Sequence, residues 1–277
     1  MKRLVVTADD FGLAREVNEA IEIAHRDGIL TAASLMVAGA AAGDAVARAK
    51  RLPKLRVGLH VVLIEAAPML PPEQLPDLVD GSGRFRTDMA RLGFDIFARR
   101  AARQQLAAEV EAQFKAYAAT GLPLDHVNAH KHFHLHPTIA GTIIAIGRSF
   151  GMTALRVPVE PRAVIAQVER APVGLSWVTG PYAALLGHAA RRAGLKTPDA
   201  VFGLAWSGAM TEPRIAGVLQ RLPDGLSELY THPGTAGGFP GHAPGYRYAD
   251  ELAALTSPEV IAAAKRGDIA LGGYGDF

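Results

Sequence analysis

The chain of 277 residues contains no cysteine. Disulfides, thiolate metal ligands and a cysteine nucleophile are therefore excluded, and the composition fits a reducing compartment. An excess of charge of either sign is also missing, because 29 Lys and Arg residues against 27 Asp and Glu residues give a net charge of +2. No basic stripe with interleaved aromatic residues is present, so we expect no nucleic-acid partner.

The sequence has no uninterrupted hydrophobic run of the length that crosses a membrane. The most apolar long stretch, residues 172–190, is broken by glycine, proline and histidine, and we interpret it as a buried or interfacial helix, with membrane contact as the alternative. The first apolar run meets two acids within a few residues, which is unlike a signal peptide. We expect a cytoplasmic protein. Peripheral contact with the inner membrane and a homodimer are left open.

Hydrophobic residues make up 49% of the chain, which is enough for a large core. Short β-like runs alternate with helical periodicity from end to end. Strands are expected near residues 3–9, 31–37, 56–63, 125–130, 153–158, 201–206, 227–232 and 267–272. The clearest helices between them are expected at 15–26, 42–51, 101–120, 137–150 and 214–222.

This alternation predicts an α/β protein with a parallel sheet, and seven or eight repeats predict closure into a distorted (β/α) TIM-like barrel. A doubly wound open sheet is the alternative, but no G-x-G-x-x-G turn follows the first strand. We expect a single domain over residues 1–277, with two insertions at about 64–100 and 160–200. In a barrel such insertions usually shape the mouth where the substrate enters.

Two adjacent carboxylates, Asp9 and Asp10, end the first predicted strand and are followed by Phe11 and Gly12. Like charges side by side repel unless a metal or a proton separates their roles. The pair therefore indicates a cation site, for which the sequence offers histidines as further ligands.

Five of the ten histidines lie within eleven residues, at His126, His130, His132, His134 and His136. A lone histidine is more often a polar core residue, but this crowding favours a metal-binding or catalytic role. Pro137 suits the first turn of a helix, so the preceding strand is expected to end near His130. Because a strand end is rigid, His130 is the best candidate ligand, with His134 and His132 as runners-up. His126 is expected lower in the barrel.

Three further residues lie on other predicted strands: His60, Arg156 and His232, the last before Pro-Gly. A buried arginine needs a carboxylate partner, and Asp9 is one candidate. The carboxyl ends of barrel strands share one face, so these residues are expected to meet the aspartates and His130 there.

One carboxylate with two imidazoles is a sound open site for zinc or a similar divalent ion. Such an ion lowers the pKa of a water towards about 7 and polarises a carbonyl. The second aspartate can then take the proton of the water, and a histidine opposite can protonate a leaving nitrogen.

Six segments, in order from residue 4 to about 255, carry a resemblance to a known family: TADDFGLAREVNEAI, TAASLMVAG, VGLH, HVNAHKHFHLHP, LRVP and ELYTHPG. The chain resembles the YdjC-like carbohydrate deacetylases, and among them the subgroup associated with hopanoid biosynthesis. That subgroup is thought to remove the acetyl group from an N-acetylglucosaminyl hopanoid. The resemblance implies a hydrolase that takes the N-acetyl group from an N-acetylglucosamine-type sugar, with an acetylated amino sugar or a glycolipid as substrate.

The resemblance also implies one divalent ion, held by Asp10, His60 and His130, for which zinc is favoured and magnesium, cobalt or nickel are alternatives. It implies Asp9 as general base and His232 as general acid, and we add Arg156 as a catalytic residue. We assign no role to the element at residues 247–252.

The sequence departs from the family pattern at two places. Lys131 replaces a histidine of the run that usually reads D-S-H-H-H, so this position is not expected to be a ligand. Residues 64–67 replace a turn that often contains glycine, which leaves substrate contacts from this loop open.

Two other functions remain as alternatives. A barrel metallo-phosphoesterase or amidohydrolase typically opens with His-x-His on the first strand, where this chain has Asp-Asp. A non-catalytic sugar- or lipid-binding protein needs no acid–base pair, so the retention of both aspartates and His232 speaks against it.

Overall fold

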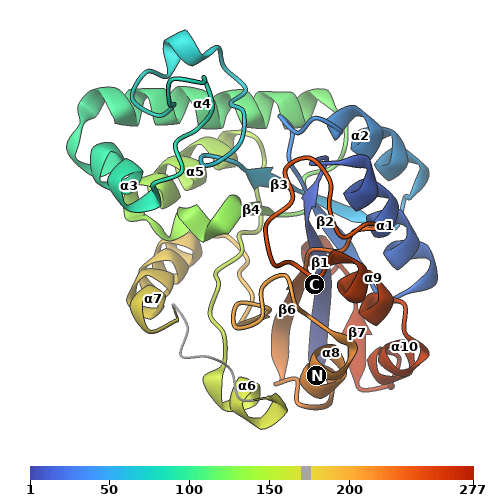
Figure 1. Cartoon of the computed structure of the whole chain (residues 1–277). Helices are drawn as coiled ribbons and strands as arrows, with labels where there is room; N and C mark the ends of the chain where they lie inside the picture. The colour runs from blue at the N-terminus through green and yellow to red at the C-terminus, as the bar shows by residue number, and fades with distance from the viewer. Residues whose placement is uncertain (170–175) are drawn as a thin grey trace.

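The computed structural model describes residues 1–169 and 176–277 (Figure 1). In this part of the chain seven strands form one sheet in which all neighbours are parallel. They are β1 (Lys2–Phe11), β2 (Ala32–Leu35), β3 (Arg56–Val61), β4 (Val127–Ala129), β5 (Ala200–Phe202), β6 (Gly225–Thr231) and β7 (Ile269–Leu271). The strand order is β4-β3-β2-β1-β6-β5, and β7 lies beside the first residues of β1.

The edges of the sheet approach each other through bridges instead of an eighth strand. Parallel bridges join Val127 to Leu155 and Ala154 to Lys196. The predicted α/β barrel of seven or eight strands is thereby confirmed in distorted form. The strand expected at 153–158 was wrong in extent, because Pro158 has no N–H with which to continue a ladder.

The five helices predicted most clearly all form within two residues of their expected ends. They are α1 (Arg15–Asp27), α2 (Ala42–Arg51), α4 (Arg100–Ala119), α5 (Pro137–Ser149) and α8 (Glu212–Gln220). The remaining described helices are α3 (Met89–Ala98), α6 (Arg162–Val168), α7 (Ser176–Arg192), α9 (Tyr248–Leu255) and α10 (Pro258–Ala264), with the short 3₁₀ turns η1 (Pro72–Gln74), η2 (His130–Leu135) and η3 (Tyr274–Asp276).

The helix α7 covers most of the apolar stretch expected at 172–190, of which residues 172–175 lie outside the described residues. It continues through Pro181, so this proline does not end the helix. Its face with Ala183 and Leu186 is buried, whereas Tyr182 and Leu185 are exposed. Among the described residues we find no helix with the length and apolar character needed to cross a membrane.

Alternate residues of each strand face the interior of the barrel. At the amino-terminal ends of the strands this interior is apolar and closes around Tyr274, which packs with Val5, Ala32, Ala154 and Leu226. Towards the carboxyl ends it becomes polar. The other face of β1, with Leu4, Val6 and Ala8, joins the main core with the surrounding helices. The fold therefore leaves a polar interior that opens at the carboxyl ends of the strands.

The segment expected as the first insertion leaves the barrel after β3 and contains η1 and α3. In Figure 1 this segment (cyan) lies at the end of the molecule towards which β1 runs. The organisation as a single domain over 1–277 stays a prediction.

Candidate metal centre and its surroundings

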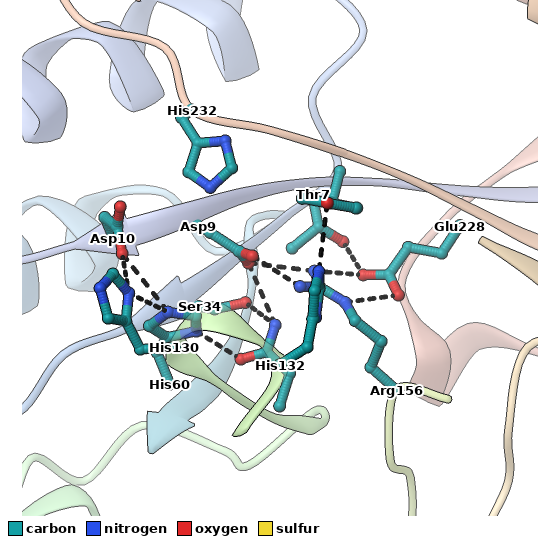
Figure 2. A network of polar contacts seen from close by, with 12 residues as sticks. Thr7, Asp9, Asp10, Ser34, His60, His130, His132, Arg156, Glu228 and His232 are labelled. Atoms are coloured by element: carbon teal, nitrogen blue, oxygen red, sulfur yellow. Dashed lines mark hydrogen bonds and ion pairs between the residues drawn. The ribbon is translucent and has the colours of Figure 1, made fainter. Parts of the chain in front are cut away.

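Both aspartates reach the mouth of the barrel because β1 is irregular near its end. In a regular strand, successive side chains point to opposite faces. Here the register with β2 shifts between Ala8 and Phe11, and Asp10 has a φ of 63°. This left-handed conformation is costly for a residue other than glycine and is typical of functional sites. It brings the carboxylate of Asp10 to the histidines near Asp9 (Figure 2).

Asp10, His60 and His130 form a candidate metal site, with one ligand atom from each residue within 4.8 Å of the others. Oδ1 of Asp10 lies 3.3 Å from Nε2 of His60 and 3.1 Å from Nδ1 of His130, and the two nitrogens are 3.3 Å apart. In a tetrahedral zinc site with bonds of about 2.0–2.1 Å, neighbouring ligand atoms are about 3.3 Å apart. The three residues therefore fit a divalent ion in both donor chemistry and spacing.

Each ligand candidate lies where its element ends or bends. His60 is near the end of β3, and His130 follows β4 directly as the first residue of η2. The expectation that the fourth strand ends near His130 is confirmed. Burial would lower the pKa of His60, but the carboxylates of Asp9 and Asp10 outweigh it and raise this pKa.

Arg156 is fully buried between two carboxylates. Its Nη1 and Nη2 donate to Asp9 at 2.5 and 3.0 Å, and its Nε and Nη2 donate to Glu228 at 2.9 and 2.8 Å. Burial would raise the pKa of Asp9, but Arg156 outweighs it and holds this pKa well below its usual range. The expected ion pair of Arg156 with Asp9 is confirmed, and Glu228 is a second partner that sequence reasoning missed.

His232 follows β6 at the mouth and is 8% exposed. Its backbone N–H donates to the carboxylate of Glu251, and its ring centroid lies 4.9 Å from that of Tyr246. Nδ1 of His232 has no hydrogen-bond partner among the described residues. Figure 2 shows the imidazole beside the two aspartates. An imidazole at this position can hold or deliver a proton next to the candidate metal site.

The crowded histidines divide into different roles. Nε2 of His134 donates to the carbonyl of Arg156 at 2.9 Å, and burial lowers the pKa of His134 to about 4. His132 lies 3.1 Å from the hydroxyl of Tyr230. These runners-up are therefore not members of the candidate metal site. Lys131 pairs with Glu65 at 2.5 Å, in agreement with the expectation that it is not a ligand.

A groove of about 240 Å³ opens beyond the carboxyl ends of β1, β2 and β3. Leu13, which lines it, donates its backbone N–H to the carbonyl of Asp10 at 3.0 Å, so the groove lies next to the backbone of Asp10. Its wall is mainly apolar, with Leu13, Met36, Val62, Ala66, Ala67 and Pro240 among the lining residues.

Asn128 is a further residue that sequence reasoning missed. Its Oδ1 accepts from Nδ1 of His60 at 2.6 Å, and its Nδ2 donates to Asp9 at 3.0 Å. The signal was present, because Asn128 lies two residues from both His126 and His130 and so shares their face of the strand. For Glu228 the signal was an acid within a buried apolar strand.

The family model described as YdjC-like protein matches residues 3–266. The chain belongs to the YdjC-like family. This result confirms the resemblance read from the motifs, whereas the hopanoid-associated subgroup stays a prediction.

Among the curated relatives of this YdjC-like chain is a carbohydrate deacetylase of Brevibacillus brevis, 38% identical over 157 residues, which are 57% of this chain and 58% of the relative. The carbohydrate deacetylase of Geobacillus stearothermophilus is 28% identical over 277 residues, covering 99% of this chain and 97% of the relative. The crystal structure of a candidate cellobiose-phosphate cleavage protein from Enterococcus faecalis V583 is similar with a TM-score of 0.78 and 25% identity, and the match covers 99% of this chain and 98% of that chain.

Proposed function

We propose that this YdjC-like chain is a metal-dependent carbohydrate N-deacetylase that hydrolyses the N-acetyl amide of an N-acetylglucosamine-type sugar and releases acetate. The observation that carries the proposal is the triangle of Asp10, His60 and His130 with spacing suited to a divalent ion. The names of the curated relatives supply the substrate class. Peripheral membrane contact and a homodimer stay predictions.

A divalent ion at this site would polarise an acetyl carbonyl and lower the pKa of a water. The donor set favours zinc, because magnesium prefers an octahedral shell of oxygen ligands. Cobalt and nickel also accept imidazole and carboxylate ligands and remain alternatives.

Asp9 is the proposed general base. Arg156 and Asn128 together occupy both acceptor positions of its Oδ1, whereas Oδ2 receives only the bond from Arg156 among the hydrogen bonds of the described residues. One lone pair of Oδ2 is thus left to accept a proton from water. Arg156 keeps this carboxylate ionised and fixed in direction.

His232 is the proposed general acid, which protonates the departing amine nitrogen. Its ring lies at the mouth beside Asp9, and its backbone is held by Glu251. The acid and the base come from the neighbouring strands β6 and β1, so both reach the same mouth of the barrel.

The finer proposal is that the sugar is carried by an apolar aglycone such as a hopanoid. The apolar groove beside Asp10 supports it, since an aglycone would fill this space. Phe94 and Phe97 on α3, each 66% exposed, add apolar surface that a lipid could cover.

The test is acetate release by purified protein after removal of metal with a chelator and after addition of zinc. We expect release only with metal, and a lower KM for an alkyl N-acetylglucosaminide than for free N-acetylglucosamine. Asp9→Asn should retain zinc but lose about 10²–10⁴-fold in kcat. His60→Ala should lose both zinc and activity. The exposed residues Asp27 and His188 supply the matched controls Asp27→Asn and His188→Ala. These variants should change neither zinc binding nor acetate release.

Full activity of Asp9→Asn, or of the protein without metal, would contradict the assignment. Binding of the sugar without acetate release would instead support the non-catalytic alternative. An equal KM for the two substrates would remove the aglycone proposal alone.

A further inference from the structure

A continuous chain of buried hydrogen bonds runs through the barrel interior to His60. Oδ2 of Asp125 lies 2.9 Å from Nδ1 of His126, and Nε2 of His126 lies 3.0 Å from Oγ of Ser34. Nδ2 of Asn128 donates to this oxygen at 2.9 Å, and Oδ1 of Asn128 lies 2.6 Å from Nδ1 of His60. All five side chains are less than 9% exposed, so water does not compete for these bonds.

Asp125, at the end of this series of hydrogen bonds, determines the direction in which the hydrogens are donated. The backbone N–H groups of Tyr274 and Gly275 donate to its carboxylate at 3.1 and 2.8 Å. Burial would raise the pKa of Asp125, but His126 and these N–H groups outweigh it and lower this pKa. An ionised carboxylate only accepts, so Nδ1 of His126 must carry the hydrogen.

The hydrogen bonds of Ser34 and Asn128 are compatible with this tautomer of His126. Asn128 donates through Nδ2 to both Ser34 and Asp9, and the two bonds together favour this orientation of the amide over the flipped one. With the hydrogen of His126 on Nδ1, its Nε2 can only accept, so the hydroxyl of Ser34 donates to it at 3.0 Å. The oxygen of Ser34 then accepts from Asn128, so both contacts of Ser34 agree with the direction set by Asp125.

At the other end of the series, Asn128 determines which ring nitrogen of His60 carries no hydrogen. With Nδ2 of Asn128 directed at Ser34 and Asp9, its Oδ1 faces His60 and accepts from Nδ1. The lone pair of Nε2 then points to the space shared with Asp10 and His130. A histidine can bind a cation only through a nitrogen without hydrogen.

We propose that Asp125, His126 and Ser34 are positioning residues that act through Asn128 to hold His60 in the tautomer that binds a cation. The inference rests on the proposed function only in taking His60 as a ligand. If the hydrogen bonds were donated in the opposite direction, Asn128 would donate to Nδ1 of His60. The hydrogen of His60 would then lie on Nε2, where it blocks the cation.

The test reads the tautomer by ¹⁵N NMR of the histidine side chains in the metal-free protein, with His60→Ala to identify the signal of His60. The spectra are recorded at a pH high enough to keep the His60 imidazole neutral, because the carboxylates of Asp9 and Asp10 raise its pKa. Zinc affinity is measured alongside by competition with a chelator. In Ser34→Ala and in Asp125→Asn we expect a larger share of His60 with hydrogen on Nε2, and zinc affinity about tenfold weaker.

Tyr117→Phe is the matched control, because the hydroxyl of Tyr117 donates to the carbonyls of Val57 and Pro123 at 2.7 and 3.0 Å and to none of the five side chains. Tyr117→Phe should lower the free energy of unfolding without changing the tautomer of His60 or the affinity for zinc. Ser34→Ala introduces no larger group into the core, so a folded protein is expected, and Asp125→Asn is isosteric. An unchanged His60 signal with unchanged zinc affinity in these variants, or equal changes in Tyr117→Phe, would overturn the proposal. Neither measurement uses substrate, so this proposal can be judged separately from the proposed deacetylase activity.

Discussion

At the scale of single residues, Arg156 determines the charge balance of the barrel interior. Its guanidinium contacts the carboxylates of Asp9 and Glu228, and all three side chains are at most 4% exposed. Glu228 also accepts from the hydroxyls of Thr7 and Tyr274, at 2.7 and 2.6 Å. The hydroxyls donate hydrogen bonds, but the arginine supplies the positive charge that both carboxylates contact, and a buried charge without a partner is strongly destabilising.

We therefore expect Arg156→Met to lower the free energy of unfolding by about 3–5 kcal/mol, because two buried carboxylates lose their cation. Arg156→Lys should lower the free energy of unfolding by less, since lysine keeps the positive charge but lacks the planar guanidinium group that contacts both carboxylates. Urea denaturation of the metal-free protein gives these values. Arg26, which pairs with Glu22 at the surface, provides the control: Arg26→Met should lose at most about 1 kcal/mol. Equal losses in the two methionine variants would contradict the argument.

At the scale of elements, three glutamates hold the loops that surround the mouth. Glu109 on α4 accepts from the backbone N–H groups of Met69 and Leu70 in the segment after β3. Glu160 accepts from three consecutive N–H groups after β5, residues 203–205. Glu251 on α9 accepts from Met210 and His232, so the element at 247–252, which had no role in the sequence, holds the loop that carries the proposed acid. Backbone groups of loops that would otherwise lack partners are thereby satisfied.

The packing of β3 against β4 requires glycine at position 58. A Cβ there would lie 2.5 Å from the backbone oxygen of His126 and 2.6 Å from its ring. Because the backbone cannot move aside, Gly58→Ala should lower the free energy of unfolding by about 1–3 kcal/mol and displace His126.

The control for this prediction is Gly141 in α5, where an added Cβ meets nothing within 4 Å. Gly141→Ala should raise the free energy of unfolding by about 0.4–1 kcal/mol, because alanine restricts the unfolded chain and suits a helix. Thermal unfolding of both variants checks the pair. A Gly58→Ala protein as stable as the parent would show that the two strands can separate.

At the scale of the whole molecule, the two ends of the chain close the lower end of the barrel together. β7 pairs with the first residues of β1, and Tyr274 fills the interior below the polar layer. Asp276 pairs with Arg56 at the start of β3. The interior carboxylates are therefore enclosed from below, so burial and the charge of Arg156 act on their pKa values in opposite directions.

This enclosure predicts a loss of stability in acid. For Asp9 and Glu228 burial would raise the pKa, but Arg156 lowers it below the ordinary values of 3.8 and 4.5. A folded pKa below the unfolded one contributes stability above the unfolded pKa, and this contribution is lost as the pH falls towards the folded pKa. The free energy of unfolding of the metal-free protein should thus decrease below about pH 4.5.

Urea denaturation at pH 7, 5, 4 and 3 measures this dependence. Arg156→Met should flatten it, because the cation that lowers both pKa values is gone. A constant free energy of unfolding between pH 6 and pH 3 in the parent protein would refute the charge balance described for the interior.

Residue types and their positions along the chain were enough to predict the strand–helix alternation and the meeting of the two aspartates with His60 and His130, and they offered Asp9 as one candidate partner for Arg156. The reason is that parallel strands place their carboxyl ends at one face, and a buried charge requires a partner. The choice of Asp10 as the ligand came from the family resemblance. The sequence pattern ranked His130 first among the five neighbouring histidines but could not assign the contacts of His132 and His134, since the turn after His130, with left-handed residues at 131 and 132, separates their directions.

The chain of amino acids by itself therefore determined which groups carry charge and which strand end each one occupies. Only the tertiary structure decided the hydrogen-bond partners of Asn128, the second carboxylate at Arg156 and the bulge that turns Asp10 towards the histidines. These features depend on distances of about 3 Å between strands that are far apart in sequence, and such distances are set by register and packing and not by local pattern.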